Sequence, residues 1–559
     1  MRLALAQLNP VVGDLEGNGR RILAAAHQAR AAGASLLLSP ELSLWGYPPR
    51  DLLLRPALIR RQGEVLEQLA ADCPADLSLL VGVAEPAEGP GQPGLYNALA
   101  LVERGTWRSV CRKRLLPSYD VFDERRYFRP GGAPAVLELA HGDRCWRLGL
   151  TICEDLWVVE GQGPVEVDPI GDLVSHRIDL LLNLSASPFG RQKGQVRQRL
   201  AARAAVRLGA PVVYLNQVGG NDELVFDGAS FVLDGAGRPL LRLACAAEDL
   251  ALWDAAAPGP AAAVAAEPDP WEQLLRVLVL GVRDYAAKCG FRRALLGLSG
   301  GIDSALVAVI AAAALGPEQV DVLRMPSPFS SAGSLDDAAA LAERLGLASC
   351  TLPIAPLMEA FAASLPPALG GPPTGVTEEN LQSRIRGTLL MALANQHGGL
   401  LLSTGNKSEL AVGYCTLYGD MNGGLAVIGD LYKTTVFGLC DWIDGPASAP
   451  CRTALGLPPH GELIGAAIRT KPPSAELRPD QRDSDSLPDY AVLDPLLKAL
   501  IEQLRTPEEL VAEGADPALV ARVARLLRGA EFKRRQAAPA LKVSGRAFGS
   551  GWRMPIASA

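Results

Sequence analysis

The residues with the clearest potential for chemistry form one short run, SGGIDS, at positions 299–304. Apolar residues at 294–298 predict a buried strand before it, and an Ala-rich apolar stretch at 302–315 predicts a helix after it. Glycines let a backbone approach a ligand closely, and the N-terminus of a helix favours an anion. A carboxylate, Asp303, fits such a site if Mg²⁺ accompanies the phosphates. No Lys follows as in a Walker A loop, so the run predicts a different phosphate site, with an ordinary glycine-rich turn as the alternative.

Three reactive side chains in the first half each follow a predicted strand: Glu41, Lys113 and Cys153. Open α/β sheets place their sites at strand ends. A thiol nucleophile, a carboxylate that takes its proton and an ammonium that stabilises an oxyanion together suit amide hydrolysis. Taken singly, each also fits a structural role, as a helix cap, a solvated cation or a small buried apolar residue. No histidine lies near these motifs in the sequence, so a Cys–His pair is the weaker interpretation.

The length of 559 residues is too great for one hydrophobic core. Residues 255–270 contain four prolines and no periodic pattern, so they predict a linker. We therefore expect two domains, 1–254 and 271–559. Short apolar strands alternate with helices on both sides of the linker, which predicts the α/β class.

Charge and cysteine usage narrow the class of protein further. A formal net charge of −7 argues against a general nucleic-acid binder. Ten cysteines form no CxxC pair and five histidines show no metal-ligand spacing, so we expect reduced thiols and a cytoplasmic location. Neither a signal peptide nor an apolar run of roughly 18 residues is apparent, so we expect no membrane association.

Further polar motifs follow SGGIDS in the second half. They are TEENLQSRIR (377–386), TGNKSE (404–409), GDLYKTTVFGL (429–439) and EFKRR (531–535), with Asp420 between the second and third. Carboxylates and cations together suit a Mg·ATP site that releases pyrophosphate. Solvated helix faces and a solvated tail are the alternatives. A Pro- and Asp-rich stretch, 473–490, predicts a surface loop that could act as a lid.

SGGIDS resembles the signature of the PP-loop ATP pyrophosphatases, which adenylate a carbonyl oxygen and release pyrophosphate. PELSLWGYPPRDLL (40–53), KRLLPSYDVFDERRYF (113–128) and GLTICEDLW (149–157) resemble the catalytic motifs of the nitrilase superfamily, in its glutaminase branch. This second resemblance covers about the first 250 residues and implies a four-layer αββα sandwich. It implies Glu41 as general base, Lys113 as second catalytic residue and Cys153 as nucleophile. It also implies glutamine contacts by Tyr119, Ser187 and Lys193.

Residues 271–559 resemble the NAD synthetases through six motifs: LSGGIDS, TEENLQSRIRG, STGNKSELAVGY, GDLYKTTVF, PSAELRPDQ and EFKRRQ. The resemblance implies a parallel-sheet PP-loop domain that adenylates and then amidates nicotinic acid adenine dinucleotide (deamido-NAD). The ATP-binding residues that it implies are Gly297, Leu298, Ser299, Gly300, Gly301, Ile302, Asp303, Ser304, Thr404, Lys433 and Ser474. It implies deamido-NAD contacts by Asn380, Glu409 and Lys533, and Mg²⁺ ligands at Asp303 and Glu409. The stretch 440–470 is richer in Pro and Gly than the family pattern, which leaves its local structure open.

The two resemblances together imply a ligase that takes nitrogen from glutamine and yields NAD, AMP, pyrophosphate and glutamate. Its partners would be small-molecule substrates, and the family implies a homo-oligomer. Pairing the two domains also leads us to expect a sheltered path for ammonia. Two alternatives stay open: a PP-loop amidotransferase that activates a different acid, and a non-catalytic nitrilase-like domain joined to an ammonia-using synthetase.

Overall fold

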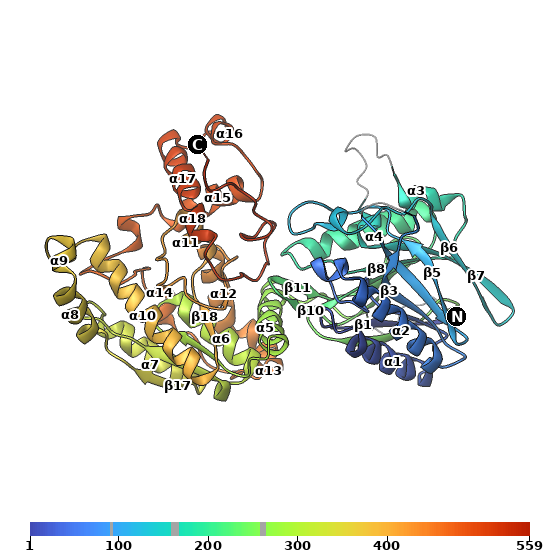
Figure 1. Cartoon of the computed structure of the whole chain (residues 1–559), viewed down its shortest axis with the longest axis horizontal. Coiled ribbons are helices and arrows are strands. Elements are labelled where there is room, and N and C mark those ends of the chain that lie inside the picture. The colour runs from blue at the N-terminus through green and yellow to red at the C-terminus, as the bar shows by residue number, and fades with distance from the viewer. Residues whose placement is uncertain (90–92, 158–166, 258–263, 559) are drawn as a thin grey trace. The chain divides into compact units, whose positions relative to one another are not determined.

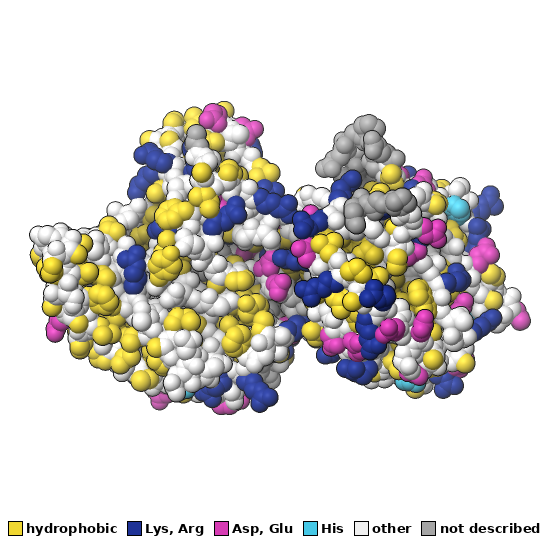
Figure 2. All heavy atoms as spheres, in the orientation of Figure 1, with side chains coloured by type: hydrophobic (Ala, Val, Ile, Leu, Met, Phe, Trp, Pro, Cys, Tyr) yellow, Lys and Arg dark blue, Asp and Glu magenta, His cyan; other side chains and the backbone are white. Residues whose placement is uncertain are grey.

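The computed structural model describes residues 1–89, 93–157, 167–257 and 264–558 (Figure 1). The chain divides into two compact units, Met1–Asp269 and Pro270–Ala559. The predicted linker, 255–270, includes residues 258–263, which lie outside the described residues, and helix α5 (Pro270–Lys288) already begins at its last position. In the part of the chain that the structure describes, no helix is long and apolar enough to cross a membrane. On the visible face of each unit, Lys and Arg side chains are interspersed with Asp and Glu (Figure 2).

Two sheets form the centre of the first unit. Among the described residues, the first sheet has six strands in the order β14-β1-β2-β3-β4-β5 and the second six in the order β13-β12-β9-β8-β7-β6. The bounds in the first are β14 (Asp249–Asp254), β1 (Arg2–Gln7), β2 (Leu36–Leu38), β3 (Ser78–Pro86), β4 (Leu95–Glu103) and β5 (Thr106–Arg112). Those in the second are β13 (Pro239–Arg242), β12 (Phe231–Leu233), β9 (Val212–Asn216), β8 (Leu180–Ser185), β7 (Arg144–Ile152) and β6 (Ala135–His141). A separate hairpin joins β10 (Val218–Asn221) to β11 (Leu224–Asp227).

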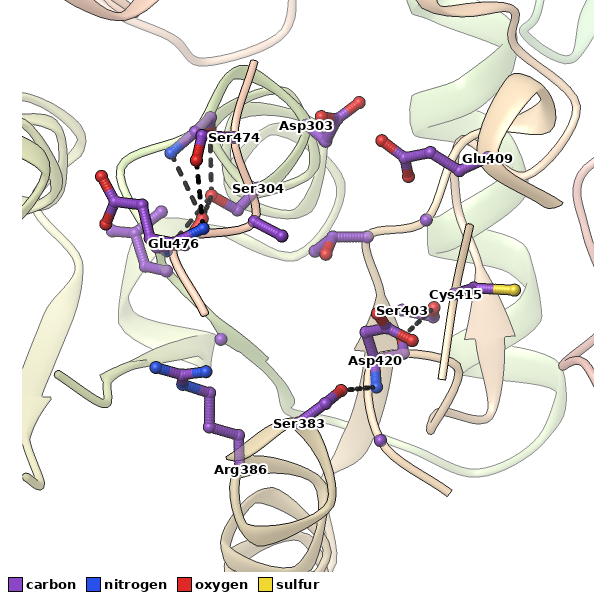
Figure 3. Close-up of a pocket in the computed structure, with 18 of the residues that line it drawn as sticks. Asp303, Ser304, Ser383, Arg386, Ser403, Glu409, Cys415, Asp420, Ser474 and Glu476 are labelled. Atoms are coloured by element: carbon purple, nitrogen blue, oxygen red, sulfur yellow. Dashed lines mark hydrogen bonds between the residues drawn. The ribbon is translucent and has the colours of Figure 1, made fainter. Parts of the chain in front are cut away.

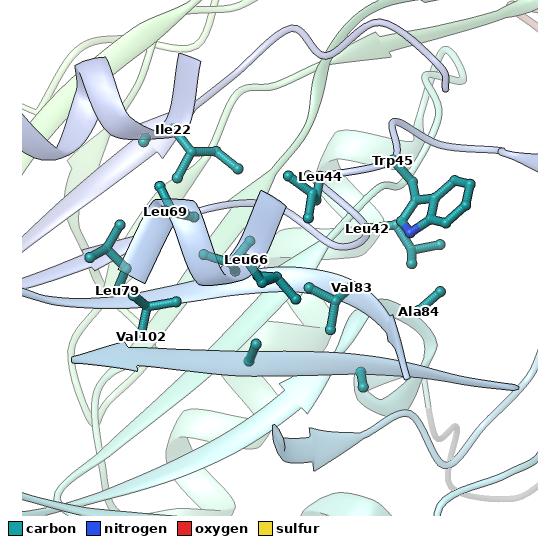
Figure 4. Close-up of a cluster of buried hydrophobic side chains, with 14 of the residues drawn as sticks. Ile22, Leu42, Leu44, Trp45, Leu66, Leu69, Leu79, Val83, Ala84 and Val102 are labelled. Atoms are coloured by element: carbon teal, nitrogen blue, oxygen red, sulfur yellow. The ribbon is translucent and has the colours of Figure 1, made fainter. Parts of the chain in front are cut away.

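Strand alternation builds four layers in this unit, because successive side chains point to opposite faces of a sheet. Leu3 and Leu5 of β1 pack in the core between the two sheets. Their neighbours Ala4 and Ala6 pack instead toward helices α1 (Leu15–Ala31) and α2 (Pro56–Asp72). Figure 4 shows side chains of these helices against those of β3 and β4. Helices α3 (Pro169–Val174) and α4 (Lys193–Leu208) cover the second sheet, which confirms the predicted αββα sandwich.

The second unit contains a five-stranded sheet in the order β17-β16-β15-β18-β19, within the described residues, and every pairing is parallel. Its strands are β15 (Ala294–Gly297), β16 (Val320–Arg324), β17 (Ala348–Thr351), β18 (Leu400–Ser403) and β19 (Leu425–Ala426). The chain leaves β15 for β16 on one side and later returns to β18 on the other. Such a switch in strand order opens a crevice at the carboxyl ends of the strands. Helices α6 (Ile302–Leu315) and α11 (Lys407–Val412) start there, and α6 has the bounds that the sequence predicted.

The remaining helices surround this sheet and form the C-terminal part of the unit. They are α7 (Ala332–Leu345), α8 (Ala355–Ser364), α9 (Pro366–Leu369), α10 (Val376–His397), α12 (Lys433–Asp444), α13 (Ala449–Ala454), α14 (Ala466–Thr470), α15 (Tyr490–Ile501), α16 (Pro507–Ala512), α17 (Pro517–Gly529) and α18 (Glu531–Arg534). Short 3-10 turns lie at Arg50–Leu54, Glu124–Arg126, Cys153–Leu156, Pro317–Gln319, Pro446–Ser448 and Asp483–Asp485.

The Pro- and Gly-rich stretch 440–470 is ordered around two side chains. The buried Arg452 guanidinium donates to the backbone carbonyls of Ile443, Pro458, His460 and Gly461. The Asp444 carboxylate accepts from the backbone N–H groups of Leu463, Ile464 and Gly465. Irregular backbone is thereby satisfied by side chains in place of helix hydrogen bonds.

Candidate functional sites

The first unit holds a buried cluster of charge at the ends of β2 and β5. Lys113 Nζ lies 2.7 Å from Glu41 Oε1, and both side chains are buried. Asn97 Nδ2 donates to Glu41 Oε1 at 2.7 Å, and the Ala186 backbone N–H donates to Glu41 Oε2 at 2.8 Å. Since both carboxylate oxygens have donors, the Glu41 side chain is fixed in one orientation.

A second carboxylate, Glu124, shares the same ammonium group. Its Oε1 lies 2.7 Å from Lys113 Nζ and accepts a hydrogen bond from the Tyr47 hydroxyl, also at 2.7 Å. Burial raises the pKa of Glu124 to about 7, although Lys113 opposes the shift. Burial alone would lower the pKa of Lys113, but Glu124 and Glu41 outweigh it and raise that pKa well above its ordinary value. Lys113 is therefore a permanent cation in the cluster.

Cys153 stands at the junction of β7 and a 3-10 turn (Cys153–Leu156), with a φ of +44°. A positive φ is uncommon for a residue other than glycine and often marks a functional turn. The Asp155 carboxylate accepts from the backbone N–H groups of Ile152, Arg114 and Leu115, so it joins the Cys153 turn to the segment after Lys113. Burial, followed by the nearby Glu41 charge, raises the pKa of the Cys153 thiol well above its ordinary value. The thiol is thus protonated at rest and needs a base in order to react.

The three predicted glutamine contacts lie around this cluster. The hydroxyl of Tyr119 donates to Oε1 of Glu154, the residue after Cys153, at 2.9 Å. Lys193 begins α4, and its Nζ lies over the rings of Phe122 and Trp157 at 5.5 and 5.4 Å. Ser187 is buried in the loop after β8, directly beyond the Ala186 N–H that binds Glu41.

Ser187 is held in place by a fully buried arginine of α4. Arg197 Nε donates to Ser187 Oγ at 3.2 Å, and Arg197 NH2 donates to the Ser187 carbonyl at 2.7 Å. The same guanidinium pairs with Asp227 at 2.8 Å. This planar group fixes the loop that carries Ser187 beside the Cys153 cluster.

A cavity of about 310 Å³ opens in the second unit at the ends of β15 and β18 (Figure 3). Every predicted ATP-binding residue except Gly300 lines it: Gly297, Leu298, Ser299, Gly301, Ile302, Asp303, Ser304, Thr404, Lys433 and Ser474. Gly300 has a φ of +81°, and a Cβ there would lie 2.1 Å from the Ser334 carbonyl oxygen. Only glycine fits this turn, because α7 packs directly against it.

The charged groups of the cavity centre on Lys433. Its ammonium contacts Asp303 Oδ2 and lies 3.2 Å from Glu409 Oε1. Burial raises the pKa of Glu409 to about 8, with further increases from Asp303 and Asp483, while Lys433 lowers it. Burial would lower the pKa of Lys433, but Asp303 and Glu409 outweigh it and raise that pKa. Because the pKa of Glu409 is about 8, a cation that binds both Asp303 and Glu409 would displace a proton from Glu409 near neutral pH.

The donor set fits Mg²⁺ that arrives with a nucleotide. Among the described residues, no group of three or more His, Cys, Asp and Glu side chains could hold a metal ion unaided. Mg²⁺ in nucleotide sites commonly takes one or two carboxylates and completes its coordination with phosphate oxygens and water. Asp303 and Glu409 supply two carboxylates in the same cavity as the SGGIDS turn.

The predicted deamido-NAD residues have different positions. Glu409 lines the cavity, whereas Asn380 and Lys533 do not. Asn380 Oδ1 accepts from the Thr416 hydroxyl at 2.8 Å. Lys533 Nζ donates to the carbonyls of Gly413 and Cys415, each at 2.7 Å. Both side chains therefore hold residues 413–416, a segment that contributes to the cavity wall, and a direct contact with a dinucleotide stays a prediction for each.

Two more carboxylates from the second half of the sequence, Asp420 and Asp430, have different roles in the structure. Asp420 lines the cavity, where its Oδ1 accepts from the Thr416 N–H. Asp430 instead pairs with the buried Lys407 at 2.9 Å and accepts from the N–H groups of Val543 and Ser544. Asp430 thus fixes the C-terminal segment.

Comparison with known proteins agrees with this geometry. A family model described as carbon-nitrogen hydrolase matches residues 2–254, and one described as NAD synthase matches residues 274–537. A glutamine-dependent NAD(+) synthetase of Synechocystis sp. is 50% identical, over 100% of this chain and 98% of the relative. That of Acinetobacter baylyi is 40% identical, over 99% of this chain and 98% of the relative. The chain belongs to the glutamine-dependent NAD(+) synthetases.

Solved structures support the same family and fold. The glutamine-dependent NAD+ synthetase of Acinetobacter baumannii, in complex with ADP, aligns with a TM-score of 0.76 at 38% identity and covers 99% of this chain and 98% of its own. That of Cytophaga hutchinsonii aligns with a TM-score of 0.81 over 100% of this chain and 98% of its own, and at 22% identity it shows the fold alone. A glutamine-dependent NAD(+) synthetase is a ligase, which confirms the enzyme class expected from the motifs.

Sequence reasoning missed several residues of these two sites. Glu124 lies within the quoted 113–128 motif, but the sequence does not distinguish it from the nearby acidic residues Asp120 and Asp123. Asn406 belongs to the pattern N-x-x-E, which indicates a helix cap and gives no sign of its bond to Asp303. Arg386 ends the 377–386 motif, which the sequence does not connect with the SGGIDS turn, whereas in the structure it lines the cavity and extends into it (Figure 3).

Proposed function

We propose that this chain converts deamido-NAD to NAD with ATP and glutamine, using Cys153 in one unit and the 297–304 turn in the other. One observation carries the proposal. A buried Glu41–Lys113 pair accompanies Cys153, while a phosphate-type turn shares a cavity with Asp303, Lys433 and Glu409. Glutamine, ATP and deamido-NAD are the substrates of the proposed reaction.

In the first unit, Glu41 acts as the base for a thiol that burial keeps protonated. Cys153 Sγ attacks the amide carbon of glutamine while its proton moves to Glu41, and Lys113 stabilises the oxyanion. The proton then passes to the leaving nitrogen, ammonia departs and a thioester remains. Water attacks the thioester with Glu41 as base, which releases glutamate and restores the thiol.

Glutamine binding in this proposal depends on residues around the nucleophile. Tyr119, Ser187 and Lys193 are the proposed contacts. The Lys193 ammonium suits the carboxylate of a free amino acid, and the Tyr119 hydroxyl can hydrogen-bond to its polar groups. Lys193 Nζ lies over the rings of Phe122 and Trp157. These rings would offer an apolar surface to the methylene groups of glutamine, next to the ammonium group that would bind its carboxylate.

In the second unit, a carboxylate oxygen of deamido-NAD attacks the α-phosphorus of ATP and pyrophosphate leaves. Ammonia then attacks the carbonyl carbon of the adenylate, AMP leaves, and the amide of NAD is formed. The proposed ATP contacts are the 297–304 turn, Thr404, Lys433 and Ser474. Asp303 and Glu409 would hold Mg²⁺, which would neutralise phosphate charge in the transition state.

Other parts of the proposal rest on indirect support. The proposed deamido-NAD contacts are Asn380, Glu409 and Lys533. Support comes from the position of Glu409 in the cavity lining and from the hydrogen bonds of the other two to residues 413–416, which contribute to the cavity wall. We further propose a homo-oligomer in a reducing, cytoplasmic environment. The ten cysteines, which form no CxxC pair, are consistent with such an environment.

The test is NAD formation from ATP, Mg²⁺, deamido-NAD and glutamine, with each component omitted in turn. The proposal expects no NAD when any one is missing, and expects an ammonium salt to replace glutamine. Nicotinic acid mononucleotide, aspartate and xanthosine monophosphate in place of deamido-NAD should release no pyrophosphate. Release with one of these acids and not with deamido-NAD would identify a different amidotransferase.

A further inference from the structure

A buried asparagine, Asn406, lies between the two proposed Mg²⁺ ligands. Its side-chain Nδ2 donates to Asp303 Oδ1 at 2.9 Å. Its Oδ1 accepts from the Glu409 backbone N–H at 3.0 Å, and its own backbone N–H donates to Glu409 Oε2 at 3.3 Å. Asn406 is 0% exposed, whereas its partners Asp303 and Glu409 are partly open to the cavity.

The four carboxylate oxygens divide evenly between two partners. Lys433 contacts Asp303 Oδ2 and Glu409 Oε1. Asn406 binds the other oxygen of each carboxylate, Asp303 Oδ1 and Glu409 Oε2. Lys433 thus occupies the position of a cation between the two carboxylates, and Asn406 orients each of them from its other oxygen.

The bond from Asn406 also connects two separate turns of the sheet. Asp303 belongs to the first turn of α6, which follows β15, whereas Asn406 is the N-cap of α11, which follows β18, and Glu409 belongs to the first turn of α11. β15 and β18 are neighbouring parallel strands. The Asn406 side chain therefore ties the Asp303 carboxylate to the first turn of α11, which carries Glu409, while the Asn406 backbone N–H binds the Glu409 carboxylate.

We propose that Asn406 is a positioning residue that directs Asp303 and Glu409 to a shared divalent cation accompanying ATP. The inference rests on the proposed function, in which these two carboxylates hold Mg²⁺. Hydrogen-bond partners of metal-binding carboxylates typically change metal affinity about 10- to 100-fold when mutated. Figure 3 shows Asp303 and Glu409 on the same side of the cavity, as the proposal requires.

Helix capping alone does not explain an asparagine here. Asp and Ser cap helices about as well as Asn, because each accepts from the N–H groups of the first turn. Only the amide combines that acceptor with a donor able to reach Asp303. Asp would place an acceptor against the Asp303 carboxylate, and the Ser hydroxyl is too short to span both partners.

The experiment measures Mn²⁺ binding to the full-length protein in the presence of ADP, by the electron paramagnetic resonance signal of free Mn²⁺. This readout needs no turnover. Asn406→Ser keeps a neutral cap without the donor to Asp303, and we expect at least a tenfold weaker Mn²⁺ affinity. Asn406→Asp keeps the cap with an added charge, and we expect a comparable loss. The apparent Mg²⁺ requirement for pyrophosphate release should rise by a similar factor.

A matched control comes from α16, whose Thr506 forms the same kind of capping box with Glu509 on the surface. Thr506→Asp should leave Mn²⁺ binding unchanged. Wild-type Mn²⁺ affinity in Asn406→Ser would overturn the inference and reduce Asn406 to a cap, even if Asn406→Asp fails to fold. Asp303→Asn distinguishes failure of this inference from failure of the proposed function. Unchanged Mn²⁺ binding in that variant would reject the metal role proposed for Asp303 itself.

Discussion

Cys153 is buried in a site where both burial and a neighbouring carboxylate raise the pKa of its thiol. Such a thiol is inert without a base, and the base proposed for it, Glu41, is fixed by donors from Lys113, Asn97 and Ala186. The proposed chemistry of Cys153 therefore depends on this one carboxylate.

We predict that Cys153→Ala abolishes glutamine-driven NAD synthesis and leaves ammonia-driven synthesis largely intact. The nucleophile is lost in the first unit, while the cavity with the 297–304 turn belongs to the second. Rates with glutamine and with an ammonium salt, measured on the same preparation, check this. Substantial glutamine-driven activity would remove Cys153 as the nucleophile, and loss of both activities would show that the units do not function separately.

Glu124 provides a pH-dependent test. Burial raises its pKa from 4.5 to about 7, so the folded protein holds this proton more tightly than the unfolded chain does. The resulting stability is fully present below about pH 4.5 and is lost as pH rises through about 7, by on the order of 3 kcal/mol. Glu124→Gln cannot titrate. We therefore predict that the stability of the variant relative to wild type improves between about pH 5 and 8.

Thermal unfolding temperatures across this pH range measure the effect, with the exposed neighbour Asp123→Asn as control. The Asp123→Asn curve should run parallel to wild type. A constant difference between Glu124→Gln and wild type would show that Glu124 does not titrate in this range.

The sequence predicted the three reactive residues because each stands directly after an apolar strand, a position that a local pattern reveals. It did not identify Glu124 or Asn97 as partners of Glu41 and Lys113. These contacts join residues 11 and 56 positions apart, and no local pattern distinguishes Glu124 from the acidic residues beside it. Tertiary packing alone selects which of them turns inward.

At the scale of elements, the strand–turn–helix around SGGIDS was predictable in detail. A short apolar run before the adjacent glycines indicates a strand, and a longer apolar run after them indicates a helix. The structure has both, and α6 has the predicted bounds. The contact of that turn with the start of α7 was not predictable, because it depends on how α7 packs. That contact explains why position 300 requires glycine.

We predict that Gly300→Ala strongly impairs pyrophosphate release and destabilises the second unit. A Cβ at this position would meet the Ser334 carbonyl oxygen at 2.1 Å, in addition to the strain of a φ of +81°. Gly290→Ala is the matched control, since Gly290 has a φ of +82° with no neighbour within 4 Å. The control should show only the conformational strain, about 1–2 kcal/mol. Equal losses of stability in both variants would contradict the role assigned to the close approach.

The predicted loop at 473–490 contains one short 3-10 turn before α15 begins at Tyr490. Composition predicted the lack of regular structure, but not the contacts that the segment makes. Glu476 accepts hydrogen bonds from the Ser331 and Ser334 hydroxyls at 2.9 and 2.7 Å, and Lys471, just before the segment, pairs with Asp337 at 2.5 Å. Such long-range contacts to α7 depend on the fold. Movement of this segment as a lid stays a prediction.

At the scale of the whole molecule, two family patterns occupy one chain, and synthesis from either nitrogen source uses the second of them. Asp303→Asn should therefore abolish NAD formation from either nitrogen source, because the proposed adenylation precedes amidation in both cases. Pyrophosphate release with deamido-NAD present and glutamine absent measures the step directly. Normal release at ordinary Mg²⁺ concentration would show that the Asp303 charge is not required. An unchanged melting curve would show that the variant is folded.

The two nitrogen sources should also differ in their dependence on pH. Free ammonia in neutral solution is mostly ammonium, which is not nucleophilic, and the unprotonated fraction rises about tenfold per pH unit below its pKa. Ammonia-driven synthesis by the Cys153→Ala variant should follow this rise. Ammonia released from glutamine is formed unprotonated, so wild-type synthesis from glutamine should vary much less if the ammonia reaches the adenylate before it equilibrates with solvent. Rates with saturating ATP and deamido-NAD, measured between about pH 6.5 and 8.5, compare the two. Parallel pH profiles would mean that glutamine-derived ammonia mixes with the bulk solution, and the expected sheltered path would then be rejected.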